Sequence, residues 1–351
     1  MSKRVVCSRA PVRIDFAGAW TDVPLFTTLT PGVVVNAAIS LYAYTTVEPL
    51  ASGSPTYGEA VQESLCPTGI RICSVDLGQY VEAASVSKIE YNGTMDLVKA
   101  ACKSSPVRAA EVTTWTDSPA GSGLGTSASL GVAALSALWQ YGNKLVTRHI
   151  CAHEAFELET KELGLLSGTQ DQYAAVLGGF NCFRCVGSNV TYNDNLNTVD
   201  ALTYELEKRL VLVYTGKSRL SSDIHSHVTS NFKAQRNHPA LRNLVKSGEL
   251  AREALLTRNI SKLTDAINMS WANQKLLHES ITNDQIESLF EIAAKNGMVA
   301  GKACGAGGGG CLLFLAERGK EHMLRKALEE HVKVLNFKFD FDGLHTWELF
   351  E

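Results

Sequence analysis

The chain has 351 residues, of which 45% are apolar and 20% are charged, and its formal net charge is -3. A charge this close to zero excludes a general attraction to nucleic acid or anionic lipid, and no run of about 18 consecutive apolar residues predicts a membrane span. The basic N-terminus has no apolar signal core, and nine scattered cysteines are typical of reduced thiols, so we expect a cytoplasmic protein of roughly two domains.

The first part of the chain alternates strand and helix signals. β-Branched and aromatic residues predict a strand over 33–48 and shorter strands over 70–90. A short helix is predicted over 94–102. From residue 112 the pattern predicts a strand, a glycine loop and an apolar helix in direct succession.

The later elements complete a mixed pattern of strands and helices. In chain order we predict helical spacing over 149–163, a loop leading into a short apolar segment over 167–180, a buried strand over 210–214, polar helices over 221–295, a short helix or turn followed by a glycine loop and a strand over 298–316, a helix over 318–334, and closing strands over 335–350. Turn formers concentrate between 185 and 210, so we divide the chain into domains of residues 1–195 and 196–351. The mixture predicts a two-layer α/β or α+β architecture.

The segment SPAGSGLGTSA, residues 118–128, lacks large side chains directly before the apolar helix. Gly121, Gly123 and Gly125 leave backbone N–H groups unobstructed, and such groups can surround an anion at a helix N-terminus. Hydroxyl groups for a phosphate or a metal ion come from Ser122, Thr126 and Ser127. An ordinary glycine turn with a helix cap would use the same residue types, but the full combination favours anion binding.

Two familiar nucleotide motifs fail in this sequence. TGKS at 215–218 resembles the end of a Walker A loop, but that motif requires glycine where the chain has Val211. Gly305, Gly307 and Gly310 spell GxGxxG but precede a predicted strand, so they lack the context of a dinucleotide site. Close approach of the backbone to a ligand is favoured over a plain turn for GAGGGG.

Five charged residues are candidates for function, and each also has an ordinary structural explanation. Glu159 lies at helical spacing beside an apolar face, where it could bind magnesium or mark the edge of that face. Asp171 could cap a helix, and Asp22 could stabilise a turn. Arg13 and Arg219 could be solvated surface charges. The residues alone therefore indicate a phosphate-binding enzyme and leave its substrate open.

Cysteine and histidine spacing does not predict a metal centre. Cys182 and Cys185 form one CxxC pair without a second pair at zinc spacing, so we interpret them as buried structural cysteines. His225 and His227 stand two residues apart in a predicted helix and do not share a face.

Three motifs together resemble those of the GHMP small-molecule kinases, the family named for galactokinase, homoserine kinase, mevalonate kinase and phosphomevalonate kinase. They are APVRIDFAGAWTDVP, SPAGSGLGTSA and GKACGAGGGGCLLF, in the family's order and approximate spacing. The resemblance spans nearly the whole chain. It implies an α+β fold with an N-terminal domain like ribosomal protein S5 domain 2, a ferredoxin-like C-terminal domain, and ATP in the cleft between them.

The resemblance also implies roles for matching positions. The first glycine loop would bind the ATP phosphates through Pro119, Gly121, Ser122, Gly123, Leu124, Gly125, Thr126 and Ser127. Ser127 and Glu159 would bind Mg²⁺. Asp171 would be the catalytic base, and Arg13 would contact both Asp171 and the reacting phosphate. Asp22 would accept hydrogen bonds from sugar hydroxyls. The other expected substrate contacts are Thr21, Gly307, Gly308, Lys217 and Arg219.

Within this family, GAWTD, NAAISLYAY, SGTQDQYAAVLGGFN and YTGKSRLSSD resemble the sugar-kinase branch that phosphorylates an anomeric hydroxyl. The implied reaction transfers phosphate from ATP to C1 of a sugar or sugar phosphate, with D-glycero-D-manno-heptose 7-phosphate, giving the 1,7-bisphosphate, as the expected substrate. Lys217 and Arg219 could hold the phosphate already present on it.

Two alternatives accompany that expectation. The tryptophan in AGAWTD resembles the WTD of bacterial and plant fucokinase domains, which points to a free sugar such as L-fucose. A non-catalytic sugar or ATP sensor would keep the fold, but Ser127, Glu159 and Asp171 are all present, which disfavours it. We expect a small-molecule sugar as the partner, no nucleic acid or membrane, and we leave a homodimer open.

Overall fold

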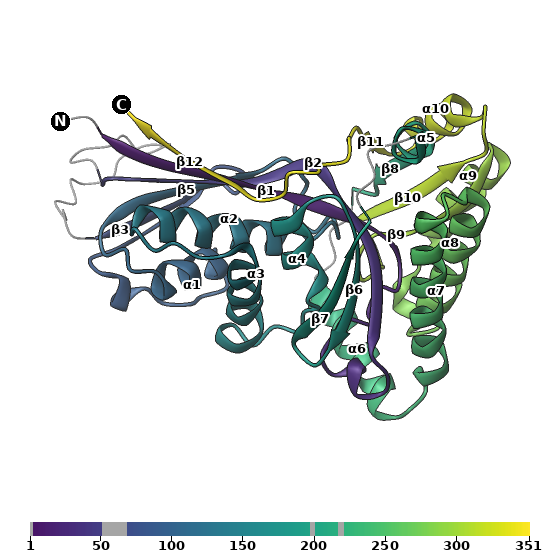
Figure 1. The fold of residues 1–351 in the computed structure, drawn as a ribbon, viewed down its shortest axis with the longest axis horizontal. Helices are drawn as coiled ribbons and strands as arrows, with labels where there is room; N and C mark the ends of the chain where they lie inside the picture. Colours follow the sequence, from purple (N-terminus) through teal and green to yellow (C-terminus); the bar gives the residue numbers. More distant parts are fainter. Residues whose placement is uncertain (1–2, 51–68, 197–200, 217–220) are drawn as a thin grey trace.

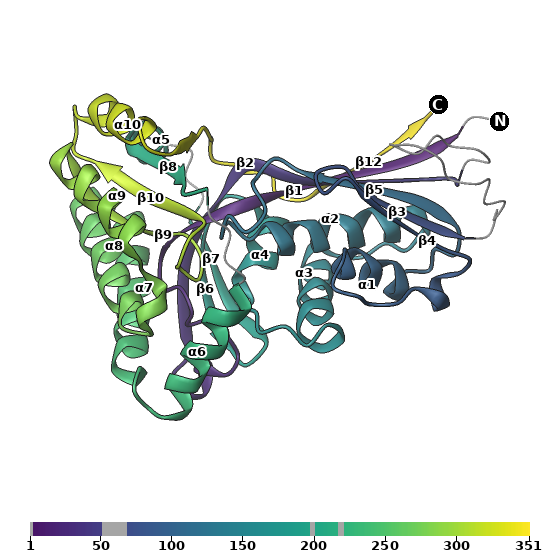
Figure 2. The same cartoon turned by 180° about the vertical axis from the view of Figure 1, so that it is seen from behind.

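The computed structural model describes residues 3–50, 69–196, 201–216 and 221–351. They form two layered units, each a sheet with helices packed on it, and the units meet where two long strands of the first sheet reach the second (Figure 1). The view from behind shows the same division (Figure 2).

The first unit is built on an eight-stranded sheet. Its strands are β1 (Arg4–Ala17), β2 (Gly32–Glu48), β3 (Ile70–Ser74), β4 (Gln79–Ala83), β5 (Ala110–Thr116), β6 (Phe180–Val186), β7 (Asn189–Asn195) and β12 (His345–Phe350). The strand order is β12-β1-β2-β5-β3-β4, and β6 pairs with β2 and β7. β2 is long enough to pair with β5 along one half and with β6 along the other.

Helices cover one face of this sheet (Figure 1). They are α1 (Asp96–Ser104), α2 (Thr126–Tyr141), α3 (Arg148–Glu157), a π-helical turn (Leu158–Glu162) that continues α3, and α4 (Gln170–Leu177); single 3-10 turns cover Phe26–Thr28 and Val86–Lys88. α2 packs closely because its sheet-facing positions are small or apolar, including the fully buried Ala133, Ala134 and Ala137. The Ser8 hydroxyl donates a 2.6 Å hydrogen bond to the Ala133 carbonyl and ties this helix to β1.

The second unit is built on a four-stranded antiparallel sheet with the order β11-β8-β10-β9. Its elements are α5 (Ala201–Arg209), β8 (Leu210–Tyr214), α6 (Ser221–Lys233), α7 (His238–Leu256), α8 (Ile260–Lys275), a 3-10 turn (Glu279–Ile281), α9 (Asp284–Lys295), β9 (Met298–Ala303), β10 (Cys311–Ala316), α10 (Glu321–Glu329) and β11 (Lys333–Leu335). This strand order is that of a ferredoxin-like domain, as expected. No helix in the described part of the chain is both long and apolar enough to span a membrane.

The end of the chain returns to the first unit. β12 pairs antiparallel with β1, so the last strand belongs to the larger sheet although it follows the whole second unit in sequence. The division after residue 195 falls between β7 and α5. We retain it as a proposal, with β12 assigned to the N-terminal domain.

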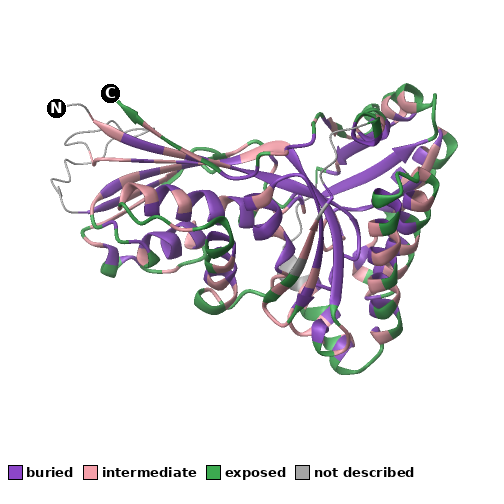
Figure 3. Ribbon diagram, viewed as in Figure 1, coloured by how far each residue is buried: buried purple, intermediate pink, exposed green. Residues whose placement is uncertain are grey.

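Burial is most complete where the two units meet. Figure 3 shows continuous buried ribbon along the parts of β1 and β2 that approach the second sheet. Val12, Ile14, Val35 and Ile39 are all fully buried there. Burying such a side chain contributes about 1.5–3 kcal/mol, so this apolar seam holds the units together and limits their relative movement.

Most predicted elements are confirmed, including the strands over 33–48 and 210–214. Two predictions are wrong. Residues 167–180 contain the helix α4 rather than only a loop, and its first N–H, on Gln170, bonds to the Asp22 carboxylate from far away in sequence. Residues 298–303 form the strand β9 rather than a helix or turn, because they pair with the strongly apolar β10.

Candidate active site

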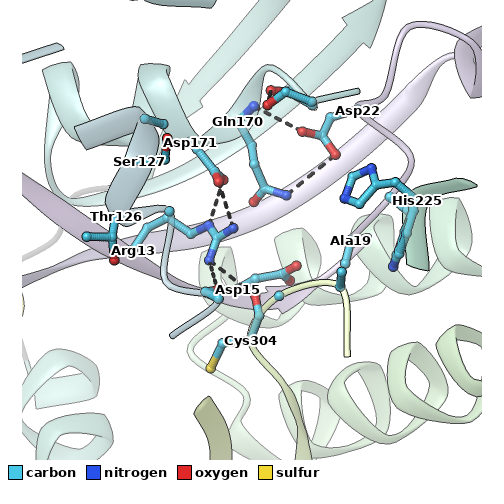
Figure 4. A pocket seen from close by; sticks show the side chains of 18 of the residues that line it. Arg13, Asp15, Ala19, Asp22, Thr126, Ser127, Gln170, Asp171, His225 and Cys304 are labelled. Atoms are coloured by element: carbon cyan, nitrogen blue, oxygen red, sulfur yellow. Dashed lines mark hydrogen bonds and ion pairs between the residues drawn. The ribbon is translucent and has the colours of Figure 1, made fainter. Parts of the chain in front are cut away.

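A cavity of about 310 Å³ lies between the two units and is lined by residues from both (Figure 4). The contributing segments are the C-terminal part of β1 and the turn after it, the first glycine loop, the start of α2, the π-helical turn, the loop before α4 and the start of α4, α6, and the second glycine loop. Many of the candidate residues meet here. They are Arg13, Asp22, Gly121, Ser122, Gly123, Gly125, Thr126, Ser127, Glu159, Asp171 and Gly307.

The first glycine loop connects β5 to α2. Gly121, Gly123 and Gly125 have φ values of 67°, 72° and 77°, a region that favours glycine, and Gly125 directly precedes the helix. No side chain caps the N-terminus of α2, so its first N–H groups are not satisfied by a cap and can face an anion. The Thr126 hydroxyl lies 2.7 Å from the Ser118 hydroxyl, which orders the loop around the helix start.

Arg13 and Asp171 form a two-pronged ion pair at the centre of the cavity. The Arg13 Nε and Nη2 atoms donate to the two Asp171 carboxylate oxygens at 2.7 and 2.9 Å. Arg13 Nη1 also donates to the carbonyls of Gly123 and Cys304 at 2.6 and 3.2 Å. Arg13 is buried, so these contacts hold Asp171 in one orientation and join the two glycine loops.

Ser127 and Glu159 form a second polar group beside the loop. The Ser127 hydroxyl donates to Glu159 Oε1 at 3.2 Å, and Gln172 Nε2 donates to Glu159 Oε2 at 2.9 Å. Burial raises the pKa of Glu159 to about 7. A buried carboxylate and a hydroxyl are hard oxygen donors of the kind that Mg²⁺ prefers. Among the described residues no group of three or more His, Cys, Asp or Glu side chains could hold a metal ion, so these two donors fit Mg²⁺ only if phosphate oxygens complete its coordination.

Asp22 is a buried carboxylate held by the start of α4. Its Oδ2 accepts the Gln170 backbone N–H at 3.0 Å, and Gln170 Nε2 lies 3.5 Å from Oδ1. Burial raises the pKa of Asp22 to about 6. A Cβ on Gly168 would lie 2.0 Å from Asp22 Oδ2, so only glycine permits this approach. Asp22 therefore has a fixed position on the cavity wall.

The second glycine loop, residues 304–311, rests on the first. A Cβ on Gly305 would lie 2.7 Å from the Gly123 Cα, and one on Gly310 would lie 2.7 Å from the Ser122 carbonyl oxygen. The Cys311 N–H donates to that same carbonyl at 2.7 Å. The close approach expected for GAGGGG is thus made, at these positions, to the backbone of another loop.

Several expected site residues do not line the cavity. Leu124 is fully buried in the core, and the Thr21 hydroxyl donates to the Gly18 carbonyl at 2.7 Å inside the turn after β1. Pro119 and Gly308 also lie outside the lining. Lys217 and Arg219 fall outside the described residues.

The cavity also contains residues that the sequence did not single out. Asp15 stands two residues after Arg13 on β1, and this spacing places both on one face of the strand, a signal that was available. Neither spacing nor composition predicts that Gln170 lines the cavity. His225 packs against Trp20 with ring centroids 4.6 Å apart, and only the folded chain brings α6 to this position. Burial lowers the pKa of His225, which favours the neutral ring.

Cys182 and Cys185 are buried with free thiols, as expected of structural cysteines. They belong to different apolar clusters, one on each side of β6. The pair therefore contributes to packing rather than to the cavity.

Comparisons with known proteins identify the family and the fold. The model of the GHMP kinases N terminal domain matches residues 90–179, and that of the GHMP kinases C terminal matches residues 251–334. The chain is 29% identical over 353 residues to D-glycero-alpha-D-manno-heptose 7-phosphate kinase of Campylobacter jejuni, across 99% of this chain and 100% of that protein. It is also 29% identical to bifunctional fucokinase/GDP-fucose pyrophosphorylase of Arabidopsis thaliana, across 93% of this chain and 32% of that protein.

A solved structure is similar to this chain over its full length. The crystal structure of a D-glycero-D-manno-heptose 1-phosphate kinase from Bacteroides thetaiotaomicron matches with a TM-score of 0.77 and 27% identity, covering 99% of this chain and 100% of that one. The fold and these similarities thus define a phosphotransferase. The chain belongs to the GHMP kinase family, and the protein is an ATP-dependent phosphotransferase with the expected fold.

Proposed function

We propose that the protein is a sugar kinase that transfers the γ-phosphate of ATP to the C1 hydroxyl of a sugar, with D-glycero-D-manno-heptose 7-phosphate as its substrate and the 1,7-bisphosphate as its product. The observation that carries this proposal is the Arg13–Asp171 pair, with contacts of 2.7 and 2.9 Å, beside the first glycine loop in one cavity. The Campylobacter jejuni relative named above supports the choice of heptose 7-phosphate.

The phosphates would be bound by the backbone N–H groups of the first glycine loop and of the α2 N-terminus. Ser127 and Glu159 would hold Mg²⁺, which supplies positive charge to the phosphates. Because phosphoryl transfer passes through a loose transition state, positioning and charge neutralisation provide most of the rate. Arg13 lines the cavity, and its positive charge would offset charge on the moving phosphate.

Asp171 would orient the acceptor hydroxyl and accept its proton. Both of its oxygens already accept from Arg13, so the carboxylate cannot rotate freely and its remaining lone pairs point in fixed directions. A carboxylate is a weak base and therefore removes the proton late in the reaction. Asp22 would accept a hydrogen bond from a second hydroxyl and set which face of the sugar is presented.

A free sugar such as L-fucose is the second candidate. Arg13 is the only lysine or arginine among the described residues that line the cavity, and its Nε, Nη1 and Nη2 atoms all donate to protein acceptors. The described wall therefore offers no second cation to a phosphate on the substrate. Similarity to the Arabidopsis thaliana fucokinase protein also favours this candidate.

A turnover screen decides between the candidates. ATP consumption is measured with heptose 7-phosphates, fucose, galactose, mannose and their phosphates, and phosphorus NMR locates the new ester. We expect ATP-dependent formation of a sugar 1-phosphate, with the heptose 7-phosphate preferred. A preference for free fucose would contradict heptose 7-phosphate as the substrate and support the second candidate. An ester at an atom other than C1 would contradict the proposed position of transfer. If no sugar is phosphorylated, the protein is not a sugar kinase.

A further inference from the structure

A buried ion pair lies directly behind the catalytic arginine and has no role in the mechanism above. Lys302 Nζ lies 3.1 Å from Asp15 Oδ1 and donates to the Asp15 backbone carbonyl at 3.2 Å. Lys302 is 0% exposed and Asp15 is 1% exposed. Within the described structure, neither carboxylate oxygen of Asp15 has a well-aligned hydrogen bond, so the lysine charge is the principal compensation for the carboxylate.

The pair joins the same two strands as the arginine does. Arg13 and Asp15 occupy one face of β1, while Lys302 and Cys304 stand at the end of β9 and just beyond it. Arg13 donates to the Cys304 carbonyl, and Lys302 contacts Asp15, so two polar contacts connect the first sheet to the second. They do so immediately before the second glycine loop begins.

The four charges alternate in sign from the reacting carboxylate inward, in the order Asp171, Arg13, Asp15 and Lys302. Burial alone would lower the pKa of Arg13. The carboxylates of Asp171 and Asp15 outweigh this effect, so the pKa of Arg13 is raised. Figure 4 shows Asp15 beside Arg13 on the cavity wall. Burial raises the pKa of Asp15, and the charges of Lys302 and Arg13 oppose that rise, so the charge that Asp15 presents to Arg13 depends on this pair.

Stability alone does not account for this arrangement. Desolvating a lysine and an aspartate costs several kcal/mol each, and apolar residues of similar volume are often as stable or more so. A pair kept at the edge of a reaction cavity therefore calls for a functional reason.

We propose that Asp15 and Lys302 form a positioning ion pair for phosphoryl transfer, which holds the second glycine loop against the first and keeps the Arg13 guanidinium in the orientation that serves Asp171. The inference rests on the proposed function. Its substrate-independent part is the placement of the end of β9 against β1. We assign neither residue a contact with the acceptor, because both act through Arg13 and the loop.

The test compares Asp15→Asn, Lys302→Met and the double variant with the unmodified enzyme. For each we measure kcat and KM with the sugar identified in the screen, the Kd of MgADP by calorimetry, and unfolding in urea. Each single variant leaves one buried charge uncompensated, so we expect both to be less stable. The double variant removes both charges and should unfold near the wild-type urea concentration.

The informative result is the behaviour of the double variant. We expect its kcat to be lower by about tenfold or more, because a small misplacement of reacting groups is costly, while its Kd for MgADP stays within about threefold of wild type. A stable double variant with wild-type kcat would overturn the proposal, since the pair would then be structural only. A loss of MgADP affinity equal to the loss in kcat would also overturn it.

A matched control is available in the same chain. Lys99 and Asp96 form another lysine–aspartate pair, with a 3.0 Å contact and a lysine that is 1% exposed, on α1 away from the cavity. Lys99→Met and Asp96→Asn should lower stability without lowering kcat. If the cavity pair behaves like this control pair, the proposal fails. A wild-type enzyme that phosphorylates no sugar would contradict the proposed function, a result distinct from an active enzyme whose ion-pair variants are unaffected.

Discussion

Both glycine loops of the cavity have glycines with positive φ, but they differ in what lies against those glycines. In the first loop, Gly121, Gly123 and Gly125 all have positive φ, and they lead into the uncapped N-terminus of α2. This conformation turns N–H groups toward a common point, where they can bind an anion. Gly125 also lies so close to Asp171 that a Cβ would be 3.0 Å from its Oδ2.

In the second loop, Gly307, Gly308 and Gly310 also have positive φ, and the loop additionally needs space next to protein backbone. Gly305 and Gly310 lie against the first loop, and a Cβ on Gly307 would be 2.5 Å from the Ile281 carbonyl oxygen. Gly308 donates its N–H to that same oxygen at 2.7 Å. The comparison teaches that when a helix follows a glycine-rich motif, the neighbouring residues are enough to predict an anion site. A glycine-rich motif before a strand can instead pack against another loop.

The largest effect is expected beside the first loop. Asp171→Asn should lower kcat by about 100-fold or more if the carboxylate accepts the proton, because an amide cannot do so. The Kd of MgADP should change little, since we assign phosphate binding to the loop and not to Asp171. Steady-state kinetics and calorimetry check both values. Asp340→Asn, at a buried aspartate away from the cavity, is the control, and near-normal turnover of Asp171→Asn would refute the assigned base.

Gly125→Ala should lower kcat by roughly 10- to 100-fold, because the new methyl group displaces Asp171 from Arg13. Gly319→Ala separates this effect from backbone strain. Gly319 has a φ of +87° but no neighbouring atom within 4 Å of an added Cβ. Both variants should lose about 1–2 kcal/mol of stability from the left-handed backbone, measured by urea unfolding. Equal activity in the two variants would remove the link between Gly125 and catalysis.

Gly305→Ala should act first on stability and second on activity. The added methyl group meets the Gly123 backbone, which has no flexible side chain to move, so we expect about 1–3 kcal/mol of destabilisation. Separation of the two loops should lower kcat by several-fold while KM for ATP changes less, because Arg13 donates to carbonyls in both loops. Unfolding curves and kinetics measured on one preparation test this order. A loss confined to kcat with unchanged stability would show that the second loop acts on the reacting groups directly.

The smallest effect concerns Asp22 and pH. Because burial raises its pKa from 3.8 to about 6, the folded protein binds more protons than the unfolded chain between about pH 4 and 6, and stability falls as pH rises through that window. Asp22→Asn removes this cost and should stabilise the free protein by about 1–3 kcal/mol at pH 7. Urea unfolding at pH 4.5 and 7 measures the difference.

The same residue gives a kinetic signature. Below about pH 6 the wild-type Asp22 becomes protonated and loses its charged acceptor, so KM for the sugar should rise by several-fold as pH falls. Asp22→Asn should have a raised KM that no longer changes over this range. A variant that keeps the wild-type pH dependence would exclude Asp22 as its source.

Local patterns predicted much of the fold and one wall of the site. The strand–glycine loop–helix unit from β5 to α2 could be predicted because adjacent residues determine it. The resemblance of ordered motifs then implied Arg13, Asp22 and Asp171, which line one cavity. α4 escaped prediction because its eight residues are bracketed by glycines and its first N–H finds a partner, Asp22, 148 residues away.

By itself, the sequence determined where the chain turns, which segments are apolar, and which loop can hold phosphates, because each depends on neighbouring residues. Tertiary structure decided that β9 is a strand, that Lys302 faces Asp15 from 287 residues away, and that α6 brings His225 to Trp20. Burial also raised the pKa values of Asp22 and Glu159. These features depend on distance and dielectric environment, which exist only after the two sheets have met.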